Sequence, residues 1–211
     1  MAGATVTARG EAVSRAKPDE GIWTFEVSSL DATPEKALAT VGKGSTELEA
    51  LLAELGVAPE KRSTTGVSVR EEHDWAEGKQ THRGYRAQNV VTVRLADSAI
   101  AGRLIEGSIA RAKASVSGPM WWIAPDNEAR VEACRQATAE AKRKAQAYAD
   151  ALGLQLGDVA EIREPIRGGI VPRQPLGGAM TLRSAPEPAL EVDPGELEVQ
   201  AQVEVTFHLD G

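Results

Sequence analysis

Two of the three histidines of this chain lie close together in the segment "EEHDWAEGKQTHRGY", which begins at position 71. A turn at Gly78-Lys79 would fold this segment into a hairpin with Trp75 opposite His82. His73 would then lie diagonal to His82, and Glu71 would continue the same face, because alternate residues of a strand point to one side. Imidazole and carboxylate groups are ligands that zinc and copper accept.

A metal site is one of two explanations for these residues. The spacing of Glu71, His73 and His82 matches no recognised metal motif, and exposed hairpin tips commonly carry histidine and acidic residues for solubility. The sequence therefore assigns no metal and leaves these three residues as candidates for one. The third histidine, His208, lies far away in the last predicted strand, where we expect a structural or solvent-facing role.

Catalysis finds little support in the sequence. There is no G-x-S-x-G elbow, and Cys134, the only cysteine, has no histidine in its own helix. We expect Cys134 to be a buried and inert thiol. The segment "VGKGST" is not a phosphate-binding loop, because position 37 is alanine and Gly44 stands where Ser or Thr should follow Lys43. We therefore predict no catalytic residues, no cofactor and no enzymatic activity.

The run Met120-Trp121-Trp122 is unusual in a chain that is poor in aromatic residues. Neighbouring strand residues point to opposite faces, so one tryptophan can enter the core while the other faces solvent, a ligand or another subunit. Exposed large aromatic residues favour interfaces. Trp121 and Trp122 are therefore the candidate oligomer contacts, with a core-and-crevice role as the alternative.

The charge of the chain limits its partners. A net charge of −7 repels nucleic-acid phosphates and anionic membrane surfaces. No apolar run is long enough for a transmembrane helix, and the N-terminal segment lacks the apolar core of a signal peptide. We expect no nucleic-acid partner, no membrane insertion and a cytoplasmic location, or a periplasmic or secreted one if a leader has been removed.

Hydrophobic periodicity and turn signals predict an α+β fold with the order β-β-α-β-β-α-β-α-β-loop-β. Because hairpins dominate, including one across 16–21, we expect a largely antiparallel sheet with helices packed on one face. A single domain is predicted over 1–211, with a Pro/Gly-rich loop at about 165–195. The expected strands are 4–16, 22–29, 62–75, 82–96, 115–125, 157–164 and 196–209, and the expected helices are 33–56, 97–112 and 126–153.

The third predicted helix has alanine at every fourth position from 129 to 149. Four residues of a straight helix turn by about 400°, so this column drifts by about 40° per step. Because of this drift, we expect a different stripe to face inward. Glu140 and Lys144 have the i,i+4 spacing of a charged pair on a helix surface, and we expect this pair to be solvated. The expected inward stripe is Val131, Cys134, Ala137, Ala141, Ala145, Tyr148 and Leu152.

Five segments resemble the SIMPL-domain family in order and spacing: "VTARGEA", "LGVAPEKRSTTGVSV", "GYRAQNVVTVRLAD", "EARVEACRQATAEAKRKAQAYADALGLQLGDVAEIRE" and "PGELEVQAQVEVTFHL". The fourth is the most specific, with its Ala-Lys rhythm and Leu-Gly-x-Val. The family includes bacterial periplasmic immunogenic and oxidative-stress-defence proteins. The resemblance implies an α+β domain that assembles into oligomers, channel-like or ring-like in at least one bacterial relative. It implies no established catalytic activity and no site residues to transfer.

Two hypotheses about function follow. The leading one is a non-enzymatic homo-oligomer that acts in stress tolerance or as a protein-interaction scaffold. The alternative is a metal- or small-molecule-binding protein that uses the 71–82 hairpin or the region of Trp121 and Trp122.

Overall fold

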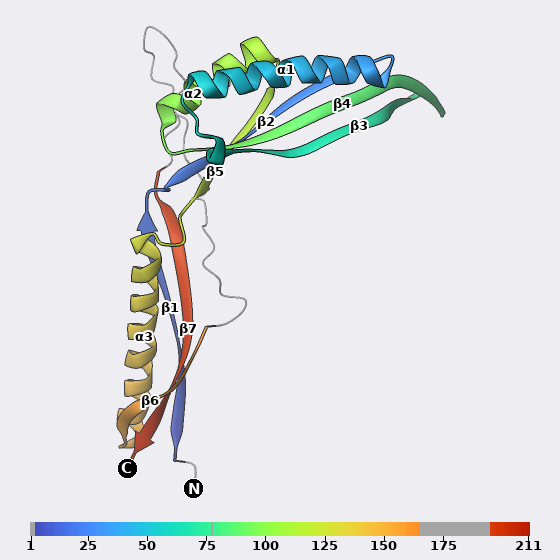
Figure 1. The fold of residues 1–211 in the computed structure, drawn as a ribbon. Helices are drawn as coiled ribbons and strands as arrows, with labels where there is room; N and C mark the ends of the chain where they lie inside the picture. Colours follow the sequence, from blue (N-terminus) through green and yellow to red (C-terminus); the bar gives the residue numbers. More distant parts are fainter. Residues whose placement is uncertain (1–2, 77, 165–194) are drawn as a thin grey trace. The chain divides into compact units, whose positions relative to one another are not determined.

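The computed structural model describes residues 3–76, 78–164 and 195–211 (Figure 1). Residues 165–194 of the predicted loop therefore lie outside the described residues. The α+β class and the predicted order of elements are confirmed. The elements are β1 (Thr5–Ala16), β2 (Glu20–Asp31), α1 (Pro34–Glu54), β3 (Arg62–Ala76), β4 (Lys79–Leu95), α2 (Ser98–Gly107), β5 (Ser115–Trp122), α3 (Glu128–Leu152), β6 (Gln155–Arg163) and β7 (Leu197–Asp210).

The chain divides into two compact units, with boundaries after Asp19 and after Trp122. The terminal unit contains β1, α3, β6 and β7, and the central unit contains β2 to β5 with α1 and α2. Each unit has its own antiparallel sheet, where a single sheet was expected. The single domain predicted over 1–211 stays a prediction.

The predicted hairpin across 16–21 is wrong, because β1 pairs with β7 whereas β2 pairs with β4 and β5. Side-chain size separates the two strands. β1 buries Ala8 and Gly10, and β2 buries the much larger Trp23 and Phe25. Proximity in sequence favoured a hairpin. However, β1 packs where only small side chains fit, whereas β2 contributes large side chains to a different core.

The central unit is a sheet of order β3-β4-β2-β5 with α1 packed on one face. Inward residues of β2 alternate with half-buried ones, as expected for a strand with one covered face. Polar side chains cap both helices of this unit: Thr33 Oγ1 accepts from the Lys36 N–H, and the Asp97 carboxylate accepts from the Ala99 N–H at 2.8 Å. The core residues of this unit include Trp23, Phe25, Val27, Val41, Leu48, Leu52, Val91, Val93 and Leu104.

The terminal unit is a sheet of order β1-β7-β6 with α3 lying along it (Figure 1). β7 is the central strand, and every residue of β1 is paired with it. Asn127 caps α3 by accepting from the Ala129 N–H at 2.9 Å, and Gly153 ends the helix at a positive φ of 69°. No helix in the described part of the chain is long and apolar enough to cross a membrane.

The inward stripe predicted for α3 is wrong in four of its members. Cys134 is exposed, and so are Val131, Tyr148 and Leu152. The whole alanine column is buried instead, at positions 129, 133, 137, 141, 145 and 149. The drift of about 40° per step is real. However, α3 contacts β1, β7 and β6, so successive alanines meet different parts of a twisted sheet.

A backbone-to-backbone contact explains why only small residues fit this interface. A Cβ atom on Gly10 of β1 would lie 1.8 Å from the carbonyl oxygen of Ala137 and 2.7 Å from the nitrogen of Ala141. The helix and the strand therefore touch without intervening side chains. Larger side chains on α3 are excluded from this surface and point to solvent.

The side chains of Glu140 and Lys144 contact the edge strand β1, where a merely solvated pair was expected. Glu140 accepts from the Glu11 backbone N–H at 2.6 Å, and Lys144 donates to the Arg9 carbonyl at 2.9 Å. The two side chains also form an ion pair at 3.2 Å. Because they occupy backbone groups on both sides of Gly10, they help to cover an edge that would otherwise be open to pairing.

We predict that Ala141→Leu lowers the free energy of unfolding by about 1–3 kcal/mol, because the site has no room for a larger side chain. Ala139→Leu, on the exposed side of the same helix, is the matched control and should change it by less than about 0.5 kcal/mol. Urea denaturation followed by circular dichroism measures both. Equal stability of the two variants would contradict the placement of the alanine column.

We also predict a pH-dependent effect of Glu140→Gln. Hydrogen bonds from the Glu11 N–H and Lys144 hold the pKa of Glu140 below its usual value. The charged carboxylate therefore stabilises the fold above the pKa of the unfolded chain, about 4.3, and this stabilisation is lost as pH falls through the lower folded pKa. Thermal unfolding should show a lower Tm for the variant at pH 7 and a smaller difference at pH 3. A difference that is the same at both pH values would refute the role of the charge.

Candidate functional site

The hairpin of β3 and β4 places the two candidate histidines directly opposite each other. The register pairs His73 with His82 and Trp75 with Gln80. The predicted pairing of Trp75 with His82 is therefore wrong. The last pair before the turn is Ala76 with Lys79, so the turn precedes Lys79, and a bulge beyond His82 shifts the register again.

Glu71, His73 and His82 do come together, and Tyr85 joins them. The ring centres of His73 and His82 are 5.4 Å apart, and those of His82 and Tyr85 are 5.3 Å apart, both in edge-to-face orientation. The Tyr85 hydroxyl donates to Glu71 Oε1 at 3.4 Å, and the second oxygen of Glu71 lies 3.8 Å from His73 Nε2. We call these four residues the histidine cluster.

Tyr85 was missed as a site residue because its alternation with Ala87 indicated only an inward-facing strand position. The signal that could have found it is Gly84, directly before it. Gly84 has a φ of 139°, and a Cβ there would lie 2.4 Å from the Asp31 carbonyl oxygen. This glycine lets the end of β2 pass close to β4, and it lies next to the bulge that brings Tyr85 beside His82.

The histidine cluster lies where the hairpin extends beyond the rest of its sheet. The last pair between β2 and β4 is Asp31 with Tyr85, so residues 79–84 of β4 pair with β3 alone. Two ion pairs join the strands here: Arg86 Nη2 donates to Glu72 Oε1 at 2.7 Å, and Arg83 Nε lies 3.3 Å from Asp74. The Arg86 guanidinium lowers the pKa of Glu72 by direct hydrogen bonding.

Among the residues that the structure describes, no group of three or more His, Cys, Asp or Glu side chains is arranged to hold a metal ion. The cluster has two imidazoles in close contact, with its carboxylate bonded to a tyrosine hydroxyl. The candidate residues are thus neighbours without forming a closed three-ligand cage.

Trp121 and Trp122 point to opposite faces of the central sheet, as the sequence predicted. Trp121 is paired with the buried Gly21, where an added Cβ would lie 2.9 Å from the indole ring. Trp122 faces the other side and has the Arg94 guanidinium 5.6 Å from its ring centre. Only Trp122 therefore lies on the face that α1 leaves uncovered.

On the face opposite α1, the described residues include an exposed patch built on three strands. Ile22 of β2 pairs with Met120 of β5 and with Arg94 of β4, so all three side chains share one side of the sheet. Met120 is 60% exposed, and Trp122 follows two residues later on the same face. We call Ile22, Arg94, Met120 and Trp122 the open-face patch.

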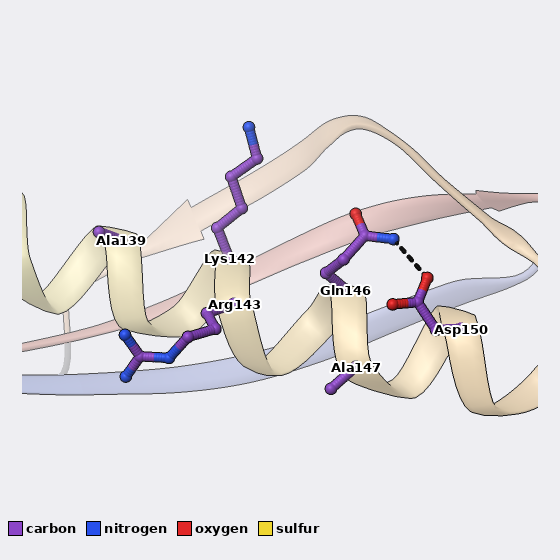
Figure 2. A pocket seen from close by; sticks show the side chains of 6 residues that line it. All are labelled: Ala139, Lys142, Arg143, Gln146, Ala147 and Asp150. Carbon is purple, nitrogen blue, oxygen red and sulfur yellow. Dashed lines mark hydrogen bonds between the residues drawn. The ribbon is translucent and has the colours of Figure 1, made fainter.

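The exposed side of α3 offers a shallow hollow, shown in Figure 2, whose lining residues all come from this one helix. Gln146 donates to Asp150 at 2.8 Å there, and Lys142 extends away from the helix. Such a surface resembles the ordinary polar face of a helix. Cys134 is on the same helix and is exposed, so the expected burial of its thiol is wrong. His208 is exposed on β7, consistent with the solvent-facing alternative.

Comparison with known proteins decides the family. Residues 6–207 match the model of the SIMPL family, described as a protein of unknown function (DUF541). This chain belongs to the SIMPL family. The match covers residues of both units, so SIMPL membership applies to the terminal and the central unit alike.

Two curated relatives match this SIMPL chain along nearly its full length. Each is named "26 kDa periplasmic immunogenic protein", one from Brucella melitensis and one from Brucella abortus. Each is 26% identical over 214 residues, which cover 98% of this chain and 85% of the relative. A solved hydantoinase/carbamoylase family amidase from Burkholderia ambifaria is 18% identical, covering 56% of this chain and 29% of that chain. Its TM-score is 0.23, which does not indicate a shared fold.

We predict that Gly84→Ala destabilises the hairpin that positions the histidine cluster. The substitution should lower the free energy of unfolding by more than about 1 kcal/mol, because of its positive φ and its contact with the Asp31 carbonyl. Gly66→Ala is the control in the same hairpin: its Cβ would meet only Val90, at 3.9 Å, and the effect should be within about 0.5 kcal/mol. Urea denaturation of both variants checks this, and a neutral Gly84→Ala would contradict it.

Proposed function

We propose that this SIMPL protein is a non-enzymatic homo-oligomer that acts through protein contacts. The observation that carries the proposal is the open-face patch. An exposed methionine, a tryptophan and an arginine gather on one side of a sheet whose other side is already packed against α1.

The composition of the patch favours a protein partner. Tryptophan, methionine and arginine are enriched in interfaces, and they contribute most when water is excluded around them. The attraction between the Arg94 guanidinium and the Trp122 ring would become stronger on burial, because cation–π contacts are more favourable when water is excluded. A second copy of this chain presents the same apolar surface, so two patches can cover each other.

Three carboxyl groups with lowered pKa values belong to contacts that hold the fold together. The pKa values of Glu54, Glu72 and Glu140 are all lowered, each first by a hydrogen bond that joins separate elements of the fold. For Glu54 the partner is Arg111, which donates to both carboxylate oxygens at 2.6 and 3.1 Å and so ties α1 to the π-helical turn Ser108–Ala112. Perturbed groups of this kind stabilise structure.

We propose a periplasmic location and a role in stress tolerance or as an interaction scaffold. The names of the two relatives support the periplasmic location, and nothing in the comparisons supports the cytoplasmic one that we expected.

Light scattering after size-exclusion chromatography tests the assembly. The parent protein should have a mass well above 22.3 kDa. Met120→Glu should shift the mass toward that of the monomer, because it places a charge in the apolar contact. Leu38→Glu, on α1 and 44% exposed, is the matched control and should leave the mass unchanged.

Two results would overturn the proposal. A parent protein that is monomeric at high concentration removes the assembly. Equal behaviour of Met120→Glu and Leu38→Glu removes the open-face patch as its contact surface.

A further inference from the structure

We infer that His73 and His82 form a two-imidazole site for a transition-metal cation of the zinc, nickel or copper class. The inference goes beyond the proposed assembly and uses residues outside the open-face patch. Its basis is the direct cross-strand pairing of the two histidines in the hairpin.

The separation of the two rings fits a metal ion between them. A zinc–nitrogen bond of about 2.0–2.1 Å places the ion roughly 3.2 Å from each ring centre, since the ring centre lies about 1.1 Å beyond its nitrogen. At a tetrahedral angle, the two ring centres would then be about 5.2 Å apart. The observed distance is 5.4 Å. In the proposed site each ring turns one nitrogen toward the shared ion.

The neighbours of the histidines support this role. Metal-bound histidines usually donate their second N–H to a carboxylate, which orients the ring and raises its basicity. Glu71 is the neighbouring carboxylate: one oxygen lies 3.8 Å from His73 Nε2, beyond hydrogen-bond length, and the other accepts from Tyr85. Glu71 thus acts as a positioning residue, and water completes the coordination, in agreement with the lack of a three-residue cage among the described residues.

The charges around the cluster also admit a cation. The nearby arginines Arg83 and Arg86 are paired with Asp74 and Glu72, whereas Glu71 lies 3.8 Å from His73. The net charge of −7 attracts cations to the chain as a whole. The His73 side chain is 30% exposed, which leaves the site open to an ion from solution. Imidazole ligands select zinc, nickel and copper over calcium and magnesium, which prefer oxygen.

Calorimetric titration with zinc chloride tests the site. The protein should contain Cys134→Ser, because the exposed thiol of Cys134 could itself bind zinc. This reference protein should bind one zinc ion per chain. His73→Gln and His82→Gln should each weaken binding by at least about tenfold, since each removes one of two ligands. Glu71→Gln should weaken it by a smaller factor.

His208→Gln is the matched control, because His208 is exposed on β7 and far from the hairpin in sequence. It should leave the zinc affinity unchanged, and calcium chloride should give no binding heat that depends on the histidines. Circular dichroism without metal should show that all variants are folded.

The inference is overturned if the reference protein binds no zinc at millimolar concentration. It is also overturned if either His73→Gln or His82→Gln binds zinc as tightly as the reference. An unchanged affinity of Glu71→Gln would remove the role given to that carboxylate. None of these results depends on whether the chain assembles, so they are distinguishable from failure of the proposed function.

Discussion

The contact between Gly10 of β1 and the backbone of α3 constrains most of the terminal unit. Because a Cβ on Gly10 would lie 1.8 Å from the Ala137 carbonyl oxygen, the strand needs glycine there and the helix needs alanine around it. The same closeness lets Glu140 and Lys144 reach the backbone of the edge strand. The packing of α3 on the sheet and the coverage of the open edge of β1 therefore both depend on how closely the two backbones approach each other.

The terminal unit brings together segments that are far apart in the sequence. β1 comes from the beginning of the sequence, α3 from its second half and β7 from its end, yet all three lie in one unit. The central unit is inserted between β1 and α3 and has its own core of large side chains around Trp23 and Phe25. In the terminal unit, α3 meets the sheet through small residues, and the surfaces that we propose for binding belong to the central unit.

The two binding surfaces that we propose occupy separate parts of the central unit. The open-face patch lies on β2, β4 and β5, opposite α1, whereas the histidine cluster lies where β3 and β4 extend past β2. Tyr85 and the buried Ala87 point to the same side of β4. Toward the middle of the sheet, this is the side that α1 covers. Self-association and metal binding would thus use different faces of one sheet, and a SIMPL protein could do both.

Much of the fold was predictable from the sequence because its signals are local. Two-residue alternation located the strands. Thr33, Asp97 and Asn127 are residue types that favour helix starts, and each accepts a hydrogen bond from a nearby N–H group. The opposite orientation of Trp121 and Trp122 follows from the geometry of any strand. The nearness of Glu71, His73 and His82 was predictable for the same reason. However, Trp75 pairs two positions away from its expected partner, and a bulge changes the register again.

Tertiary structure alone decided which surfaces meet. Periodicity shows which face of an element is buried but not how near its partner comes, so the sequence suggested an inward stripe containing Val131 and Tyr148 where the helix buries alanines. It also could not show that β1 pairs with β7, because partner choice depends on contacts between residues nearly 200 positions apart in the chain. The sequence by itself determined the elements, their order and the SIMPL resemblance. The close approach at Gly10, the division into two sheets and the pairing of His73 with His82 depend on distances between chain segments, which arise only when the segments pack together.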